Sequence, residues 1–256
     1  MFKFFRVTVL LSVLVFVALS AYTLDSSLRD WEHSKWVVIY PINGDGSAAS
    51  ERYISRLNDD AFTSLQRFLN REAARYALPK RDPFRVRLGP AVTEQPPVAP
   101  ESGSWLAVVW WSLTLRYWAA DFNESDDGPP ADIKIFVEYY DPAAYHILPH
   151  SVGVKKLSLA VVKAFADRDS RGSNKVVIAH ELMHLFGATD KYDPVNSLPL
   201  FPDGYAEPNK QPRYPQTKAE LMGGRIPISA SKAEIPGGFS QVVVGNKTAA
   251  EVGWSN

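Results

Sequence analysis

The chain has 256 residues, 46% of them hydrophobic, and its 28 basic residues equal its 28 acidic residues, so the formal net charge is zero. This length and apolar content indicate one compact domain with a sizeable core rather than a disordered chain. The balanced charge argues against nucleic acid as a partner, and the absence of cysteine excludes disulfides, thiol catalysis and cysteine-ligated zinc.

The first 24 residues have the character of a segment that directs export. A basic residue, Arg6, precedes an uncharged run of eighteen residues, 7–24, a length between that of a signal-peptide core and that of a membrane-spanning helix. We therefore expect residues 1–24 to be a signal peptide or an N-terminal membrane anchor, and residues 31–256 to form one exported domain. That domain would be secreted or periplasmic, or anchored on the extracytoplasmic side, and only the N-terminal segment would contact the membrane.

The first part of the domain alternates between strand-like and helix-like patterns. A short apolar run at residues 36–40 is closed by a proline and an Asn-Gly turn and predicts a buried strand. Residues 48–77 carry apolar side chains at three- and four-residue steps and predict one long helix, which Pro79 ends. Residues 84–88 alternate as in a half-exposed strand, and the proline-rich stretch at residues 90–103 predicts a loop.

The middle of the chain is aromatic and then acidic. Residues 105–120 hold four of the seven tryptophans and predict a helix that is buried or faces an interface; packing in the core is the preferred interpretation. The acidic stretch at residues 121–130 could bind calcium, but it lacks the spacing of a known calcium loop, so a solvated loop is preferred. Residues 133–139 predict a strand, and residues 153–165 predict another strand or two strands joined by a turn.

The segment His180-Glu181-Leu182-Met183-His184 carries the clearest functional signal. Two residues four apart lie on the same face of a helix, so both imidazoles can face one point. Ser173 and Asn174 precede an apolar run and predict the start of that helix. Gly187 stands where a left-handed residue would end it and reverse the chain.

This arrangement predicts a metal site with an open position. His180 and His184 can each offer one nitrogen to a single ion, and Glu181 beside them can take a proton from a water molecule. Asp190, three residues after the glycine, could reach the same ion and leave the fourth tetrahedral position free. Two ordinary histidines on a helix are the alternative, but the predicted cap, the glycine and the spaced aspartate all agree with a metal site.

These residues resemble the extended motif of metzincin-type zinc metallopeptidases, H-E-x-x-H-x-x-G-x-x-H, in its snapalysin-like form with aspartate last. Five residues match it position by position: His180, Glu181, His184, Gly187 and Asp190. The resemblance covers about residues 173–225 and implies an α/β (α+β) zincin fold, with a mixed twisted sheet, a long backing helix, the active-site helix and a methionine turn. Met222, which precedes two glycines, is the candidate for that turn.

The resemblance also implies a function: an exported metalloendopeptidase that hydrolyses peptide bonds of a peptide or protein substrate. Its cofactor would be Zn²⁺, held by His180, His184 and Asp190, and Glu181 would activate the attacking water. The alternative is an exported zinc-binding module without catalysis, which recognises a partner protein through its aromatic and proline-rich surfaces. A site of that kind has no need of the base at Glu181.

Two choices stay open at the predicted site. Asp193 and Glu220 are carboxylates close to the motif in sequence, so either could replace Asp190 as the third ligand. A phenol could stabilise the oxyanion of the transition state. Three tyrosines are candidates for this role: Tyr192, Tyr205 and Tyr214.

The last part of the chain has weaker patterns. Prolines recur between residues 194 and 215 and predict an ordered but irregular loop, which the resemblance places beside the substrate cleft. Residues 217–221 predict a short helical turn. A late strand is expected at residues 241–244 and a short final helix at residues 247–254.

Overall fold

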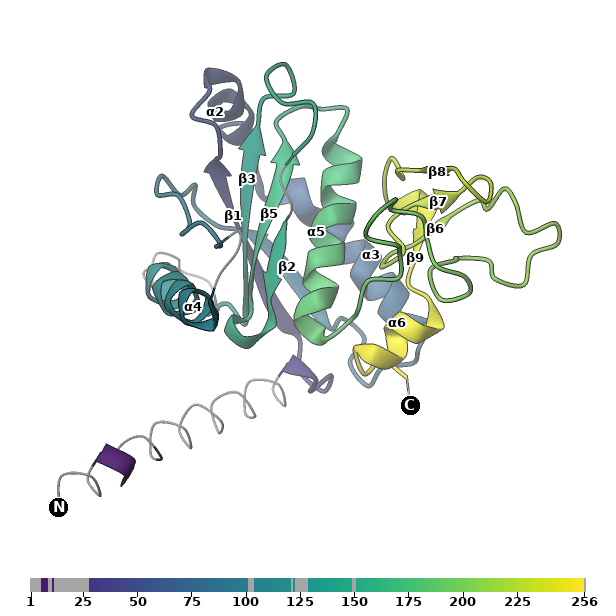
Figure 1. Ribbon diagram of the computed structural model, residues 1–256, viewed down its shortest axis with the longest axis horizontal. Coiled ribbons are helices and arrows are strands. Elements are labelled where there is room, and N and C mark those ends of the chain that lie inside the picture. Colours follow the sequence, from purple (N-terminus) through teal and green to yellow (C-terminus); the bar gives the residue numbers. More distant parts are fainter. Residues whose placement is uncertain are drawn as a thin grey trace.

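The computed structural model describes residues 6–8, 11, 28–100, 104–120, 122, 129–148 and 151–255. Its centre is a five-stranded sheet in the order β2-β1-β3-β5-β4 (Figure 1). Four strands are parallel and β4, at the edge, runs antiparallel to β5. Their bounds are β1 (Lys35–Asn43), β2 (Phe84–Leu88), β3 (Ile133–Tyr140), β4 (Val152–Val154) and β5 (Leu159–Phe165). The predicted α/β class and mixed sheet are confirmed, as is the division of residues 153–165 into two strands.

Most of the predicted leader, residues 1–24, lies outside the described residues. The same is true of most of the acidic stretch at residues 121–130, for which calcium binding was the alternative. Within the described parts of the chain, every helix is too short or too polar to cross a membrane.

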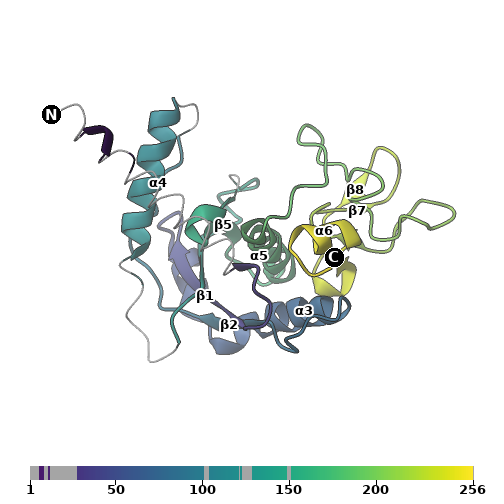
Figure 2. The same cartoon turned by 90° about the horizontal axis from the view of Figure 1, so that it is seen from below.

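Strand β1 is buried on both faces of the sheet. Val37 and Ile39 pack into the core on one face, whereas Val38 and Tyr40 pack on the other. A strand covered on both sides is apolar at successive positions, which explains why its sequence does not alternate. Each fully buried Val or Ile side chain contributes about 1.5–3 kcal/mol. Three helices cover the two faces (Figures 1 and 2): α3 (Thr63–Ala74) and α5 (Arg171–Phe186) on one, and α4 (Trp105–Ala120) on the other.

The single helix predicted at residues 48–77 is wrong. The segment forms α2 (Ala48–Ile54), a 3-10 turn (Asp59–Phe62) and then α3. The break falls at Asn58, which adopts an extended conformation with φ −138° and ψ 177°. Asn and Asp side chains compete for backbone hydrogen bonds and favour helix ends over helix interiors, so the run Asn58-Asp59-Asp60 interrupts the helix despite the apolar periodicity.

Helix α4 has the predicted bounds, but its predicted place in the core is wrong for most of its length. Leu115 and Ala119 are buried against the sheet, whereas Trp105 and Trp110 are 74% and 70% exposed. The helix is apolar on nearly all sides, so its sequence gives no indication of which side packs. One side packs, and the other is exposed.

The C-terminal part adds two small sheets and a last helix beside α5 (Figure 1). The predicted helical turn at residues 217–221 is wrong, since β6 (Ala219–Glu220) pairs there with β9 (Val242–Val243), which confirms the late strand. The remaining elements are β7 (Ile226–Pro227), β8 (Ala233–Glu234) and α6 (Asn246–Glu251). Trp31 joins this part to the core, because its indole donates to the Val252 carbonyl at 3.0 Å and its ring packs against Trp254 and Phe186.

Candidate metal centre

Helix α5 starts earlier than the sequence predicts. It begins at Arg171 after Ser170, so neither Ser173 nor Asn174 is its N-cap. Asn174 is buried and bonds to the backbone of Phe165 in β5, accepting from its N–H at 3.1 Å and donating to its carbonyl at 2.8 Å. The residue predicted to cap the helix therefore fixes the helix against the sheet.

The predicted end of α5 is confirmed. Gly187 has φ +105°, in the left-handed region that favours glycine, and its N–H donates to the His184 carbonyl at 3.0 Å. The next amide, that of Ala188, donates to the Met183 carbonyl at 3.1 Å. This reversal returns the chain toward the helix and brings Asp190 to the two histidines.

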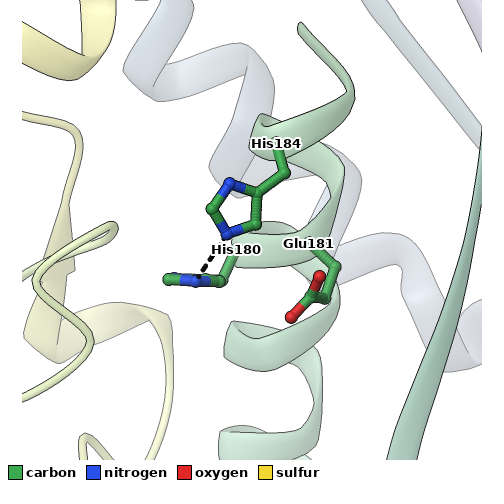
Figure 3. Close-up of side chains that lie close together, drawn as sticks. All are labelled: His180, Glu181 and His184. Atoms are coloured by element: carbon green, nitrogen blue, oxygen red, sulfur yellow. Dashed lines mark hydrogen bonds between the residues drawn. The ribbon is translucent and has the colours of Figure 1, made fainter. Parts of the chain in front are cut away.

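Three ligand-type atoms converge beside α5. The His180 and His184 Nε2 atoms lie 3.1 Å apart, and the Asp190 Oδ1 atom is 3.0 Å from the first and 3.2 Å from the second. Figure 3 shows the two imidazoles turned toward each other from one side of the helix. Zinc bonds of about 2.0–2.1 Å at tetrahedral angles separate ligand atoms by about 3.3 Å. The triangle is therefore close to the size that one ion requires.

The outer nitrogens of both histidines are held by the backbone. His180 Nδ1 lies 3.0 Å from the Leu221 carbonyl oxygen, and His184 Nδ1 lies 2.8 Å from the Ala188 carbonyl oxygen. A carbonyl can only accept, so each Nδ1 carries a proton, and in the neutral imidazole that a metal ion requires each Nε2 would offer its lone pair. Both lone pairs face the same point. The donor set therefore fits a divalent cation such as zinc.

Glu181 lies beside the two metal-facing histidines on α5. Its carboxylate and the two imidazoles offer ligand atoms that all lie within 4.8 Å of one another, and Figure 3 shows it projecting from the next position of the helix. A carboxylate in this position could contact a water molecule that an ion at the histidines would hold. Burial raises the pKa of Glu181, and the two imidazoles oppose that shift.

The two alternative third ligands are engaged elsewhere. The buried Glu220 carboxylate accepts from three donors at 2.8–3.0 Å: Gly223 N, Gly245 N and Thr248 Oγ1. Asp193 accepts from the N–H of Val195 and the side chain of Asn196, within its own loop. Of these three carboxylates, Asp190 is the one that contacts both imidazoles.

Asp190 and His184 shift each other's ionisation in opposite directions. Burial raises the pKa of Asp190, but hydrogen bonds from His180 and His184 outweigh it, and the net pKa is well below the usual range. Burial lowers the pKa of His184, but the hydrogen bonds to Asp190 and the Ala188 carbonyl outweigh it, and the net pKa is raised. The ionised Asp190 carboxylate therefore favours a positive charge at the point where its oxygen and the two imidazole Nε2 atoms converge.

Met222 lies in the turn that supports His180. It is fully buried, and Leu221 just before it supplies the carbonyl that holds the imidazole. Gly223 allows the turn to pack closely, because a Cβ there would lie 2.4 Å from the Gly204 carbonyl oxygen. Met222, the predicted turn residue, is therefore the direct neighbour of the residue whose carbonyl holds His180.

A cleft of about 850 Å³ opens in front of these residues. Its lining includes the three predicted ligands and the predicted base, but not Met222. The other lining residues are Leu148, Ser151, Gly153, Lys163, Val176, Val177, Tyr192, Leu221, Gly224 and Arg225. Pro194 and Ser197 of the proline-rich loop line a neighbouring hollow, which shares Tyr192, Gly224 and Arg225 with the cleft.

Only one of the three candidate tyrosines lines this cleft. The ring centre of Tyr192 is 6.1 Å from that of His180, whereas the hydroxyls of Tyr205 and Tyr214 bond to each other at 2.8 Å. Burial, and then the charge of Asp190, raise the pKa of Tyr192. Its phenol therefore stays protonated, and a hydrogen bond with the Asp190 carboxylate adds to the rise.

Sequence reasoning missed a charged pair in the wall of the cleft. Lys163 in β5 bonds to the buried Glu138 in β3, which also accepts from the Tyr140 hydroxyl at 2.8 Å. Burial lowers the pKa of Lys163 to about 8. The available signal was a charged residue late in each of two apolar strands, Glu138 in β3 and Lys163 in β5, and the sheet register places these two side by side.

No protein-family model matches the chain, and a search of curated protein sequences also returned no match. The candidate site is therefore interpreted from its own geometry: a group in α5 that could hold a metal ion, at the side of an α/β sheet.

Proposed function

We propose that the protein is an exported zinc-dependent endopeptidase of the metzincin type, with His180, His184 and Asp190 as the metal ligands. One observation carries the proposal. The two imidazole Nε2 atoms and the Asp190 oxygen meet within 3.0–3.2 Å, with both outer nitrogens fixed by carbonyls and a buried carboxylate alongside. When bound, zinc supplies a Lewis acid that lowers the pKa of water and polarises a carbonyl group.

Glu181 is the general base in this proposal. Its raised pKa, caused by burial, brings it closer to the working pH, so that it can take a proton from the attacking water and hand it to the leaving amine. The phenol of Tyr192 donates a hydrogen bond to the oxyanion that forms at the scissile carbonyl.

Strand β4 supplies a place for an extended substrate. It is an edge of the sheet, and among the described strands only β5 pairs with it. Gly153 within β4 lines the cleft, and a Cβ placed there would be 3.5 Å from the Glu181 carboxylate. A peptide that adds to the free edge would pair through its backbone and run past Glu181. Backbone pairing favours an endopeptidase, since it does not require a chain end.

The proposal is tested by measuring zinc per chain and hydrolysis of a mixed peptide library, with and without a chelator. Wild-type protein should hold about one zinc per chain, cleave internal peptide bonds and lose cleavage when chelated. Glu181→Gln should keep the zinc and lose at least about a hundredfold in rate, the usual contribution of a general base. A wild-type protein that binds zinc and cleaves nothing supports instead the non-catalytic zinc-binding module, and one that binds no zinc contradicts both.

A further inference from the structure

Helix α4 carries a broad apolar surface that faces away from the sheet. Its members recur at steps of three and four residues and so share one side of the helix. We call this surface the outer face of α4; it consists of Trp105, Leu106, Val109, Trp110, Leu113 and Tyr117, all exposed. The opposite side is buried on the sheet through Leu115 and Ala119.

The composition of the outer face is that of a lipid contact. Soluble proteins rarely expose a large contiguous apolar patch without a binding role. Tryptophan and tyrosine favour the boundary between lipid and water, where the ring is apolar and its N–H or O–H stays hydrated. The sixteen residues of α4 give a length of about 24 Å, which is too short to cross a bilayer of about 30 Å. Such a helix lies on the membrane surface.

Helix α4 ends at the edge of the sheet where the described part of the domain begins. The last turn of α4 lies at the amino edge of the sheet, where Lys134 donates to the Ala119 carbonyl at 2.6 Å. Leu28 is buried just before β1 begins at that same edge, in the core cluster on the α5 side of the sheet. Three residues, 25–27, separate it from the run at residues 7–24, and the four peptide steps from residue 24 to residue 28 span at most about 14 Å.

We propose that the outer face of α4 docks on the surface of the lipid bilayer that residues 7–24 are expected to enter. The short connection keeps the domain next to that bilayer, and the outer face then becomes buried in the interface. Helix α5 lies on the other side of the sheet (Figure 2). Docking through α4 therefore turns the metal cleft away from the lipid and toward the aqueous phase.

The docking depends on apolar area and requires no anionic lipid. Arg116 is the only charged residue in α4, and the residues that follow the helix are acidic rather than basic. A cluster of lysines and arginines is what attracts a helix to acidic headgroups. Neutral phosphatidylcholine should therefore be enough.

The absence of cysteine allows a test with one label at a time on the full chain. Val109→Cys on the outer face and Val195→Cys in the C-terminal part both replace exposed valines, 47% and 92% accessible. Each variant is labelled with an environment-sensitive dye and reconstituted in phosphatidylcholine vesicles with or without brominated lipid. The label at position 109 should shift its emission to the blue and be quenched by the brominated lipid, whereas the label at position 195 should do neither.

Replacement of a neighbour tests whether the whole face takes part. Trp110→Ser, added to the labelled Val109→Cys variant, should reduce quenching by the brominated lipid. The loss of one large apolar contact should lower the equilibrium constant for docking by about tenfold. A matched thermal melt shows that the variant is folded.

A label at position 109 that is shielded from water but not quenched by lipid means that residues 7–24 or a second copy cover the face, and overturns the proposal. In the unlabelled Val109→Cys variant, a disulfide formed between two chains after addition of an oxidant identifies the second copy. Docking that requires anionic lipid also contradicts the proposal.

Discussion

The Glu251 carboxylate lies 2.7 Å from the Lys191 ammonium group and ties the last helix to the loop that carries Asp190. The same carboxylate accepts from the N–H of Thr189 at 2.9 Å and from its hydroxyl at 3.0 Å. Glu251 thus holds both neighbours of Asp190 without contacting the site itself. It is a positioning residue, because it fixes the backbone from which the third carboxylate projects.

Glu251→Gln should therefore weaken zinc binding although it removes no ligand. Loss of this kind of support typically costs about 10–100-fold in metal affinity, and it leaves the buried Lys191 without its charged partner. Competition with a fluorescent chelator measures the change. Glu234→Gln, which breaks the exposed pair with Lys232, is the matched control. Equal zinc affinity in the two variants would show that Asp190 needs no such support.

The choice of third ligand gives a second prediction. Asp190→Ala should lower the zinc content, whereas Asp193→Ala should leave it unchanged, because Asp193 bonds within its own loop. Glu220→Gln should keep zinc but lower the free energy of unfolding by about 1–3 kcal/mol, since it disturbs a buried acceptor of three hydrogen bonds. Metal analysis and urea unfolding separate the two effects. Zinc loss confined to the Glu220 variant would make Glu220 the ligand.

Tyr192→Phe should lower kcat with little change in KM, because the phenol acts on the oxyanion and not on the bound substrate. Removal of one such donor costs about 10²–10³ in kcat. Tyr205→Phe is the control, since the Tyr205 hydroxyl bonds to that of Tyr214. The kinetics of peptide hydrolysis are measured for both variants. An equal, small decrease in kcat in each would show that Tyr192 does not stabilise the oxyanion.

The Lys163–Glu138 pair predicts a pH dependence of stability. The folded-state pKa of Lys163, about 8, is below the ordinary value of 10.5, as burial disfavours the cation. Between these values the unfolded chain binds more protons, so this group makes stability rise with pH, by at most about 1.4 kcal/mol per pH unit. The double variant Glu138→Gln, Lys163→Met should lack this contribution. Urea unfolding from pH 7.5 to 10.5 compares the slopes; identical slopes would contradict the burial effect.

The sequence predicted those parts of the fold whose cause is local. The run at residues 36–40, the alternation at residues 84–88 and the stop at Gly187 each correspond to an observed element. The convergence of His180, His184 and Asp190 follows from helix periodicity and one glycine turn, so it too could be predicted.

What the sequence did not predict depends on contacts between distant segments. Glu251 is sixty residues from Lys191, and no local pattern joins them. The pairing of Lys163 with Glu138 requires the order of strands in the sheet. The exposed side of α4 was missed for a different reason: a helix that is apolar all round does not indicate which side packs. The break at Asn58 shows polar capping residues overriding apolar periodicity.

The contact between Trp31 and Trp254, whose ring centres are 6.0 Å apart, means that the beginning and the end of the folded domain are neighbours. A permuted gene could therefore join residue 255 to residue 28 through a short glycine-serine linker and open the chain at the exposed Val98. Because the cleft is built from segments that all lie beyond Val98 in sequence, such a rearranged polypeptide should assemble it intact. Formation of the site would then depend on the packing of Trp31 against Trp254 more than on which segment of the chain is synthesised first.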